Sequence, residues 1–154
     1  MSAPADTTPL AGWFDGLTHL LPVRVYYEDT DFTGVVYHGN YARYFERGRS
    51  DFLRLAGVKH AELLAQDEPM AISVTRLALD FRASARIDDA LLVHTRYETV
   101  RGPRLIIGQS IVRGRTLICK AEVEAVCIGL DGRVRRPPKA LVAILTPWLS
   151  TSAP

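Results

Sequence analysis

The sequence predicts an α+β domain in which one long helix packs on one face of an antiparallel sheet of about five strands. Apolar residues from Tyr41 to Ala56 recur at helical spacing. Segments 70–82, 90–101, 104–114 and 116–129 alternate apolar and polar residues as strands do, and turn-forming residues separate them. Consecutive strands with short turns indicate an antiparallel sheet rather than a βαβ fold. A single helix and such a sheet bury their apolar faces against each other.

The element boundaries come from local patterns. Residues 22–28 alternate and form the first predicted strand, and turn-forming residues follow it. Asn40 is a favourable N-cap for the long helix, and Gly57 lies where a helix C′ residue is expected. Residues 59–66 suggest a short second helix, and Pro137–Pro138 could begin a terminal helix that runs through Ala143.

Length and composition fit one globular domain. The chain has 154 residues, of which 47% are hydrophobic, and its formal net charge of +2 is too small to indicate nucleic-acid binding. We expect the domain to span residues 21–146, between a loosely ordered tail at 1–20 and another at 147–154. No apolar run approaches the ~20 residues of a membrane span, and the N-terminus does not resemble a signal peptide, so we expect a cytoplasmic protein.

The two cysteines, Cys119 and Cys127, lie on the same face of one predicted strand, eight residues apart. An extended strand would separate them by about 26 Å, too far for a disulfide. The residues around them have no zinc-ligand spacing. We therefore expect buried, reduced thiols, with no metal site.

Residues with chemical potential concentrate between Tyr26 and Arg49, in the stretch YYEDTDFTGVVYHGNYARYFERGR. A carboxylate such as Asp31 can attack a carbonyl carbon or activate a water molecule. The N–H groups at a helix N-terminus can stabilise an oxyanion, and Gly34 permits a sharp turn between the two. Each residue also has a purely structural interpretation, since Asp favours turns and His38 could cap a helix. From the residues alone, the catalytic and structural interpretations are nearly balanced.

This stretch resembles the motif of the 4-hydroxybenzoyl-CoA thioesterase superfamily, and most closely its YbgC-type branch, the acyl-CoA thioesterases associated with the Tol–Pal system. The matching residues are Tyr27, Asp29, Thr30, Asp31, Gly34, Val35, Val36, Tyr37, His38, Asn40, Tyr41, Glu46, Arg47 and Arg49. The resemblance implies a hotdog fold, a long helix wrapped by a curved five-stranded antiparallel sheet. It also implies an enzyme that hydrolyses acyl-CoA thioesters without a cofactor.

The resemblance also assigns roles to residues. Asp31 would be the general base or nucleophile, and backbone N–H groups near Tyr37 and His38 would polarise the thioester carbonyl. Tyr27 and His38 would help to position Asp31, water or substrate, while Asp29 would brace the loop. Gly34, Val35 and Asn40, in the same motif, are expected to contact the substrate.

The family further implies CoA binding at a subunit interface in a homotetramer built as a dimer of dimers. Arg101 and Arg104 lie where phosphate contacts are expected, although Arg104 replaces the small hydroxyl residue that is common in this branch. A solvated basic turn is an equally good interpretation of these two arginines. Acyl carrier protein is an alternative substrate carrier, and envelope proteins at the inner face of the inner membrane are candidate partners.

Two other functions remain as alternatives. A hotdog dehydratase or hydratase would use His38 as its principal acid/base with Asp31 as partner. A scaffold would hold acyl carriers at the cell envelope without cleaving them. Release of free thiol from an acyl-CoA distinguishes the thioesterase from both.

Overall fold

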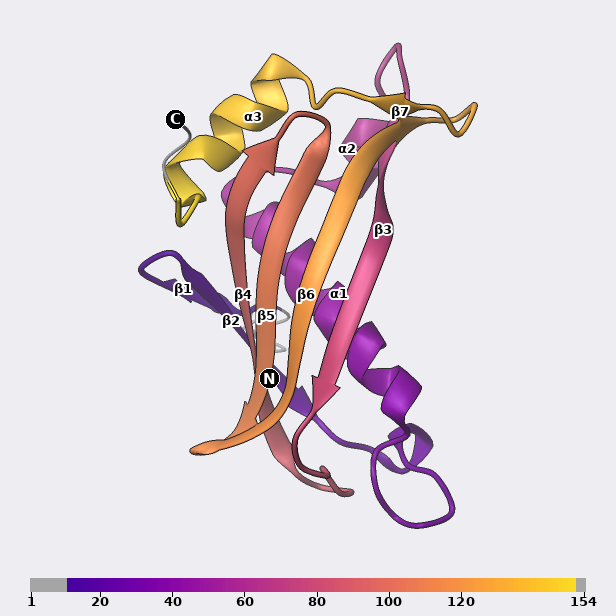
Figure 1. Ribbon diagram of the computed structural model, residues 1–154, viewed down its shortest axis with the longest axis vertical. Coiled ribbons are helices and arrows are strands. Elements are labelled where there is room, and N and C mark those ends of the chain that lie inside the picture. The colour runs from indigo at the N-terminus through magenta and orange to yellow at the C-terminus, as the bar shows by residue number, and fades with distance from the viewer. Residues whose placement is uncertain (1–10, 152–154) are drawn as a thin grey trace, which may run out of the picture.

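The computed structural model describes residues 11–151, which form one antiparallel sheet and one long helix (Figure 1). The strands are β1 (Trp13–Asp15), β2 (Thr18–Arg24), β3 (Met70–Phe81), β4 (Ala90–Arg101), β5 (Arg104–Arg113), β6 (Thr116–Gly129) and β7 (Val134–Arg135). The helices are α1 (His38–Ala56), α2 (His60–Leu64) and α3 (Lys139–Leu145), with 3₁₀ helices η1 (Tyr27–Asp29) and η2 (Thr146–Trp148).

All strand pairs are antiparallel, in the order β1-β2-β4-β5-β6-β3, and β7 pairs with β6. The predicted fold class is therefore confirmed. The five strands of the prediction are the five long ones, and the sequence analysis missed the short strands β1 and β7. Gly102 and Gly114 have φ angles of 59° and 57° in the two tight turns of the β4–β5–β6 meander, a conformation that favours glycine. Strand β3 forms one edge of the sheet.

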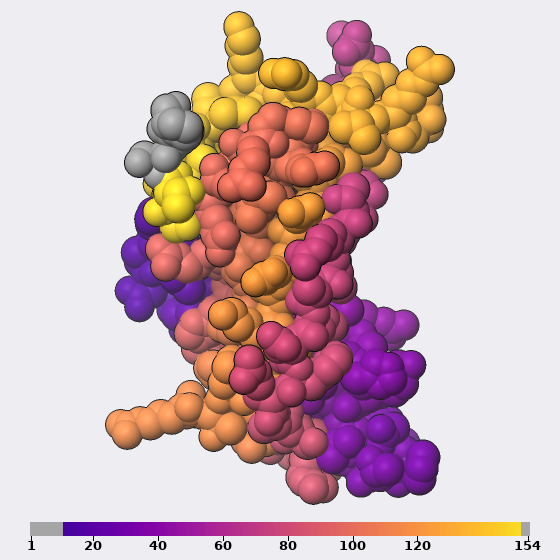
Figure 2. All heavy atoms as spheres, viewed as in Figure 1, coloured from indigo at the N-terminus to yellow at the C-terminus, as the bar shows by residue number. Residues whose placement is uncertain are grey.

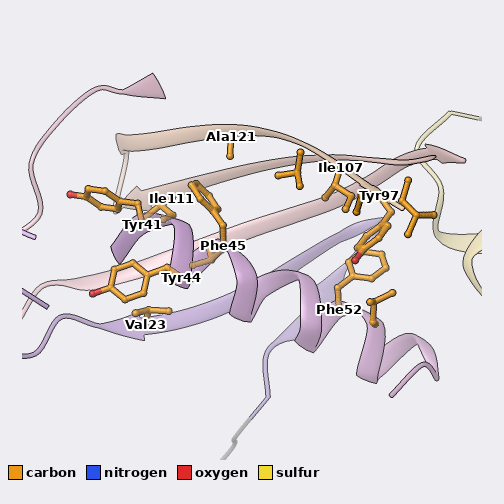
Figure 3. Close-up of a cluster of buried hydrophobic side chains, with 14 of the residues drawn as sticks. Val23, Tyr41, Tyr44, Phe45, Phe52, Tyr97, Ile107, Ile111 and Ala121 are labelled. Carbon is orange, nitrogen blue, oxygen red and sulfur yellow. The ribbon is translucent and has the colours of Figure 1, made fainter. Parts of the chain in front are cut away.

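Helix α1 crosses one face of the sheet and supplies much of the core (Figure 3). Tyr44, Phe45 and Phe52 are at most 1% exposed. Gly48 allows the close approach, because a Cβ atom there would lie 2.7 Å from Thr95 Oγ1 on β4. The Gln109 side chain on β5 donates from Nε2 to the Phe45 carbonyl oxygen at 2.9 Å. Packing and this buried hydrogen bond together fix α1 on the sheet.

The expectation of a loosely ordered segment at residues 1–20 is wrong for residues 13–20, which form β1 and the start of β2. Asp51 on α1 explains the difference. Its Oδ2 atom lies 2.7 Å from His19 Nε2 and accepts a 2.7 Å hydrogen bond from the Gly12 N–H. The Phe14 ring also stacks on Trp148, with centroids 4.0 Å apart. The residues in each of these contacts are distant in sequence, so local sequence patterns do not predict the contacts. Residues 1–10 lie outside the described residues.

Two boundaries beside the long helix also differ from prediction. The strand predicted for 22–28 ends at Arg24, because the Asp29 carboxylate accepts from the Tyr26 N–H at 2.8 Å and folds the chain into η1. Helix α1 starts at His38 with Tyr37 as its N-cap, so Asn40 lies inside the first turn instead of capping it. The predicted role of Gly57 is confirmed, with a φ of 108° at the end of α1.

The remaining predictions concern the C-terminal half. Helices α2 and α3 lie where short helices were expected, and both cysteines are buried and free as predicted. Within the predicted C-terminal tail at 147–154, Ser150 and Thr151 are attached to β4, because their N–H groups donate to the Tyr97 and Glu98 carbonyls at 3.1 and 3.0 Å. Residues 152–154 lie outside the described residues.

Candidate active site

Asp31 lies in a compact loop between η1 and α1. The Asp31 N–H donates to the Val35 carbonyl at 2.9 Å, and the Gly34 N–H donates to the Asp31 carbonyl at 3.0 Å. Gly34 closes this turn with a φ of 83°, in the left-handed region that L-residues avoid. The loop therefore holds the Asp31 backbone in one place.

The same loop is attached to the body of the protein. The Val36 N–H donates to the Ala85 carbonyl at 2.8 Å. The Asp29 carbonyl accepts two hydrogen bonds, from the Tyr37 N–H at 2.9 Å and from the Asn40 side-chain amide at 2.8 Å. Asn40 thus fastens the loop to the first turn of α1, which fixes the carboxylate relative to the helix end.

The Asp31 carboxylate is open to solvent on one side and hydrogen-bonded on the other. Its Oδ1 atom accepts from the Thr33 hydroxyl at 2.5 Å and from the Thr33 N–H at 2.8 Å. These bonds, the hydroxyl first, lower the pKa of Asp31 below its ordinary value of 3.8, and the nearby His38 contributes in the same direction. The group is therefore ionised at neutral pH, as a base or nucleophile requires.

The N-terminus of α1 offers unpaired donors beside this carboxylate. Within residues 11–151, the N–H groups of His38 and Gly39 have no hydrogen-bond acceptor, and no side chain caps the helix. The Tyr37 N–H, which the family resemblance suggested as an oxyanion donor, is already bonded to the Asp29 carbonyl. The available donors are therefore those of His38 and Gly39, one residue further along the chain than expected.

Carboxylate and helix end open into the same surface depression. Its lining residues are Glu28, Thr30, Asp31, Tyr37, Gly39, Asn40 and Arg43. An anion that formed in this depression would meet the free N–H groups and the partial positive charge of the helix terminus. The arrangement suits a reaction that develops negative charge on a carbonyl oxygen.

The other predicted residues of the motif surround this depression. The His38 ring packs 4.4 Å from the Tyr37 ring, centroid to centroid, and 6.3 Å from the Phe81 ring at the end of β3. Tyr27 is 83% exposed on η1. Gly34 and Val35 form the turn itself. The structure therefore brings Asp31, His38, Gly34, Val35 and Asn40 together, whereas Tyr27 is not among the residues that line the depression.

Arg101 and Arg104 lie elsewhere. They flank the β4–β5 turn at the top of Figure 1, whereas the Asp31 loop is at the bottom. Strand β4 runs between them, and its 12 residues span about 36 Å at roughly 3.3 Å per residue. Within one chain, these two arginines do not contribute to the Asp31 site. They could approach it only from another copy of the protein.

The sequence analysis missed Thr33, Gly39 and Arg43. Thr33 follows Asp31 by two residues, a spacing at which Asp commonly accepts from the backbone and which could have predicted the bond. Gly39 lets the Tyr37 ring lie against the first turn of α1, since a Cβ atom there would lie 2.7 Å from Tyr37 Cε1. Whether Arg43 lines the depression depends on where α1 begins. The sequence placed the helix start at Asn40, whereas the helix begins at His38.

Comparison with known proteins agrees with this site. A family model described as the thioesterase-like superfamily matches residues 25–145, which contain the Asp31 loop, α1 and strands β3 to β7.

Within residues 11–151, no group of three or more His, Cys, Asp or Glu side chains is arranged to hold a metal ion.

Two curated relatives are named as thioester hydrolases. The acyl-CoA thioester hydrolase YbgC of Escherichia coli is 42% identical over 124 residues, which cover 79% of this chain and 91% of that protein. The acyl-CoA thioesterase YbgC of Haemophilus influenzae is 40% identical over 109 residues, covering 71% of this chain and 79% of that protein. The predicted resemblance to this branch is confirmed. The hydrolase names favour the first of the three functions considered from the sequence.

Solved structures extend the comparison to the fold. A probable thioesterase from Bartonella henselae has a TM-score of 0.76 at 38% identity and covers 79% of this chain and 99% of that one. A 4-hydroxybenzoyl-CoA thioesterase mutant in complex with 4-hydroxybenzoyl-CoA also gives a TM-score of 0.76, at 17% identity and over 83% of this chain and 98% of that one. At that identity the second likeness shows the fold alone, and it confirms the predicted hotdog architecture.

Proposed function

Because this chain belongs to the thioesterase-like superfamily, we propose that it hydrolyses acyl-CoA thioesters at the Asp31 loop, without a metal or organic cofactor. One observation carries the proposal. The ionised carboxylate of Asp31 and Gly39, whose N–H group at the helix end is free, line the same depression. These are the two components that thioester hydrolysis needs, a group that delivers the attack and donors for the oxyanion.

The chemistry follows from this arrangement. The thioester carbonyl oxygen accepts hydrogen bonds from the His38 and Gly39 N–H groups, which places the carbonyl carbon beside Asp31. As a general base, Asp31 removes a proton from the attacking water. The tetrahedral intermediate then collapses, the C–S bond breaks, and the CoA sulfur leaves and takes up a proton.

As a nucleophile, Asp31 would instead attack the carbonyl carbon and expel CoA, which leaves a mixed anhydride for water to hydrolyse. Either role requires the ionised carboxylate. His38 and Tyr27 act by positioning the carboxylate, the water or the acyl group. Gly34, Val35 and Asn40 shape the turn against which the substrate lies.

The hydrogen bonds to Asp31 predict the acid side of the pH profile. Because its pKa is lowered, activity should persist as the pH falls through 3.8 and decline only below that value. Thr33→Val removes the hydroxyl donor and keeps the backbone donor, so the acid limb should move to higher pH. The measurement is kcat/KM against pH on an acyl-N-acetylcysteamine, with circular dichroism to confirm folding. An unchanged acid limb in Thr33→Val would exclude Asp31 as the titrating group.

The free edge of the sheet supports the predicted homo-oligomer. No strand of the described chain pairs with the outer side of β3, which lies at the border of the sheet in Figure 2. Val74, Leu77 and Phe81 on this strand are 38–50% exposed. A second copy of the chain can pair its own β3 with this unpaired edge and cover the apolar side chains. The dimer-of-dimers arrangement is proposed from the family resemblance.

Sedimentation tests the oligomer. We expect the 17.1 kDa chain to sediment as a dimer or tetramer at micromolar concentration. Leu77→Lys should shift it towards the monomer, because it places a charge at the centre of the edge. A wild-type monomer at this concentration would refute the oligomer.

Location and further partners are proposed from the family alone. No helix within residues 11–151 is long and apolar enough to cross a membrane. We propose a cytoplasmic enzyme that works near the inner face of the inner membrane with Tol–Pal envelope proteins, and acyl carrier protein as a second substrate carrier. Copurification of the native complex would test the envelope association.

A further inference from the structure

We propose that Tyr44 is a positioning residue for Asp31, because its buried hydroxyl donates a hydrogen bond to the Asp29 carboxylate and so holds the loop that carries Asp31. The inference rests on the proposed function, since it concerns how the same site fixes its reacting carboxylate. Tyr44 does not contact the depression itself, so it acts through Asp29.

The Tyr44 hydroxyl is a buried polar group without a partner. Tyr44 is 1% exposed, and within residues 11–151 its hydroxyl oxygen has no hydrogen-bond partner. Buried polar groups nearly always have a partner, because an unsatisfied donor loses its bonds to water and gains none in return. Phenylalanine would fill the same position in the core without this cost. The hydroxyl at this position therefore needs an explanation.

The Asp29 carboxylate offers a matching acceptor. Its Oδ2 atom accepts from the Tyr26 N–H at 2.8 Å, whereas its Oδ1 atom makes no hydrogen bond within residues 11–151. An ionised carboxylate has about four acceptor positions on its two oxygens, so Oδ1 is free to accept a hydroxyl donor. A donor without an acceptor and an acceptor without a donor are thus both present beside the Asp31 loop.

The first turns of α1 bring these two groups together. Asn40 and Tyr44 are four residues apart, so their side chains lie on the same face of the helix. The Asn40 amide already donates to the Asp29 carbonyl oxygen at 2.8 Å. Burial raises the pKa of the Tyr44 hydroxyl, and the neighbouring Asp29 carboxylate raises it further. A small rotation of that carboxylate therefore completes the hydrogen bond.

This bond would connect the core of the protein to the reacting group. The Asp29 backbone is already fixed to α1, because its carbonyl accepts from the Tyr37 N–H at 2.9 Å. Tyr44 would fix the Asp29 side chain as well, two residues before Asp31. The loop would then have little freedom to move Asp31 away from the Gly39 N–H. Displacement of a reacting group by about 1 Å can lower a rate by about 10²-fold.

The test is Tyr44→Phe, which removes the hydroxyl and keeps the ring. We expect kcat for the best acyl-CoA substrate to fall by about tenfold, since a hydrogen bond to a charged group is worth at least that factor. KM should change little, because Tyr44 does not line the depression. Steady-state kinetics and a thermal melt measure the activity and the stability of the same preparation.

Tyr97→Phe is the matched control. Tyr97 is also 1% exposed, and its hydroxyl donates to the Arg49 carbonyl oxygen at 3.5 Å. Figure 3 shows Tyr97 and Tyr44 at opposite ends of the buried cluster. The control loses the same atom from the same core, so its Tm should fall at least as much as that of Tyr44→Phe. Its kcat should equal that of wild type.

Two further measurements connect the effect with Asp29. In the Asp29→Asn background, Tyr44→Phe should lower kcat by much less than tenfold, because the acceptor charge is already absent. In the ligand-free protein, hydrogen–deuterium exchange of the peptide that contains Asp31 should be faster in Tyr44→Phe and unchanged in Tyr97→Phe. The exchange measurement does not depend on catalysis.

Three outcomes would overturn the inference. The first is wild-type kcat and wild-type exchange of the Asp31 peptide in Tyr44→Phe. The second is an equal loss of kcat in Tyr44→Phe and Tyr97→Phe, which would show a general effect on the core. The third is a tenfold loss from Tyr44→Phe that persists in the Asp29→Asn background. If wild type cleaves no acyl-CoA but exchange is faster in Tyr44→Phe alone, the proposed hydrolysis is refuted and the bond to Asp29 is supported.

Discussion

Asp31→Asn is expected to lower kcat for the best acyl-CoA substrate by about 10²–10⁴-fold, the usual contribution of a positioned general base. The substitution keeps the shape of the side chain and removes the charge. Asn can still accept the hydrogen bonds of the Thr33 hydroxyl and N–H, so the loop should keep its conformation. The loss should therefore fall on kcat rather than on stability, which steady-state kinetics and a thermal melt measure together.

Asp29→Asn is the matched control. Asp29 lies two residues away, and its carboxylate accepts from the Tyr26 N–H at 2.8 Å. Its substitution should disturb the loop without removing the reacting group, so the loss in kcat should be smaller than in Asp31→Asn. An equal loss in both variants would mean that the negative charge of the loop matters and the position of Asp31 does not.

A single turnover in ¹⁸O water separates the two roles of Asp31. Label in the Asp31 carboxylate would support the anhydride route. Label confined to the acid product would support direct attack by water. Mass spectrometry of the peptide that contains Asp31 makes the distinction.

Phe45→Ala should lower the free energy of unfolding by about 3–5 kcal/mol, the usual cost of removing a buried aromatic side chain. Phe45 is fully buried between α1 and the sheet (Figure 3), three residues before Gly48, where α1 approaches β4 closely. Gly48 and Gln109 fix the helix there, so the site has little freedom to collapse around the cavity. Urea unfolding followed by circular dichroism measures the change.

Leu55→Ala is the control for this prediction. Leu55 lies on the same helix and is 41% exposed, so its replacement should cost much less. Similar losses in both variants would show that α1 is not held on the sheet in the way described.

Most of the fold that the sequence predicted has a strong local period. Helix α1 and strands β4 to β6 bury one face each, and that face appears as a repeat in the sequence. The edge strand β3 is an exception, because most of its residues are exposed or half-buried. The hairpin of β1 and β2 was missed because its stability depends on Asp51, which is 32 residues beyond His19. The end of β2 was misplaced because Asp29 folds the next residues into η1 through a side-chain bond.

The sequence predicted the residues of the candidate site, but not which backbone N–H groups are free to donate hydrogen bonds. The motif from Tyr27 to Arg49 identified Asp31 and the helix end, which the structure brings together. It could not show that the Tyr37 N–H is used by the Asp29 carbonyl, because this bond exists only once the loop has closed on α1. The distance between the Asp31 loop and Arg101 likewise follows from the sheet topology and not from any local pattern.

The most direct test of the central claim is to measure free CoA and free acid released from a panel of acyl-CoA esters, with wild type and Asp31→Asn side by side. The panel spans short, long and aromatic acyl groups. We predict equal amounts of CoA and acid from at least one ester with wild type, and a loss of about 10²-fold or more with the variant. Folded wild type that releases CoA from no ester, or a variant that matches wild type on the best ester, would contradict hydrolysis at Asp31.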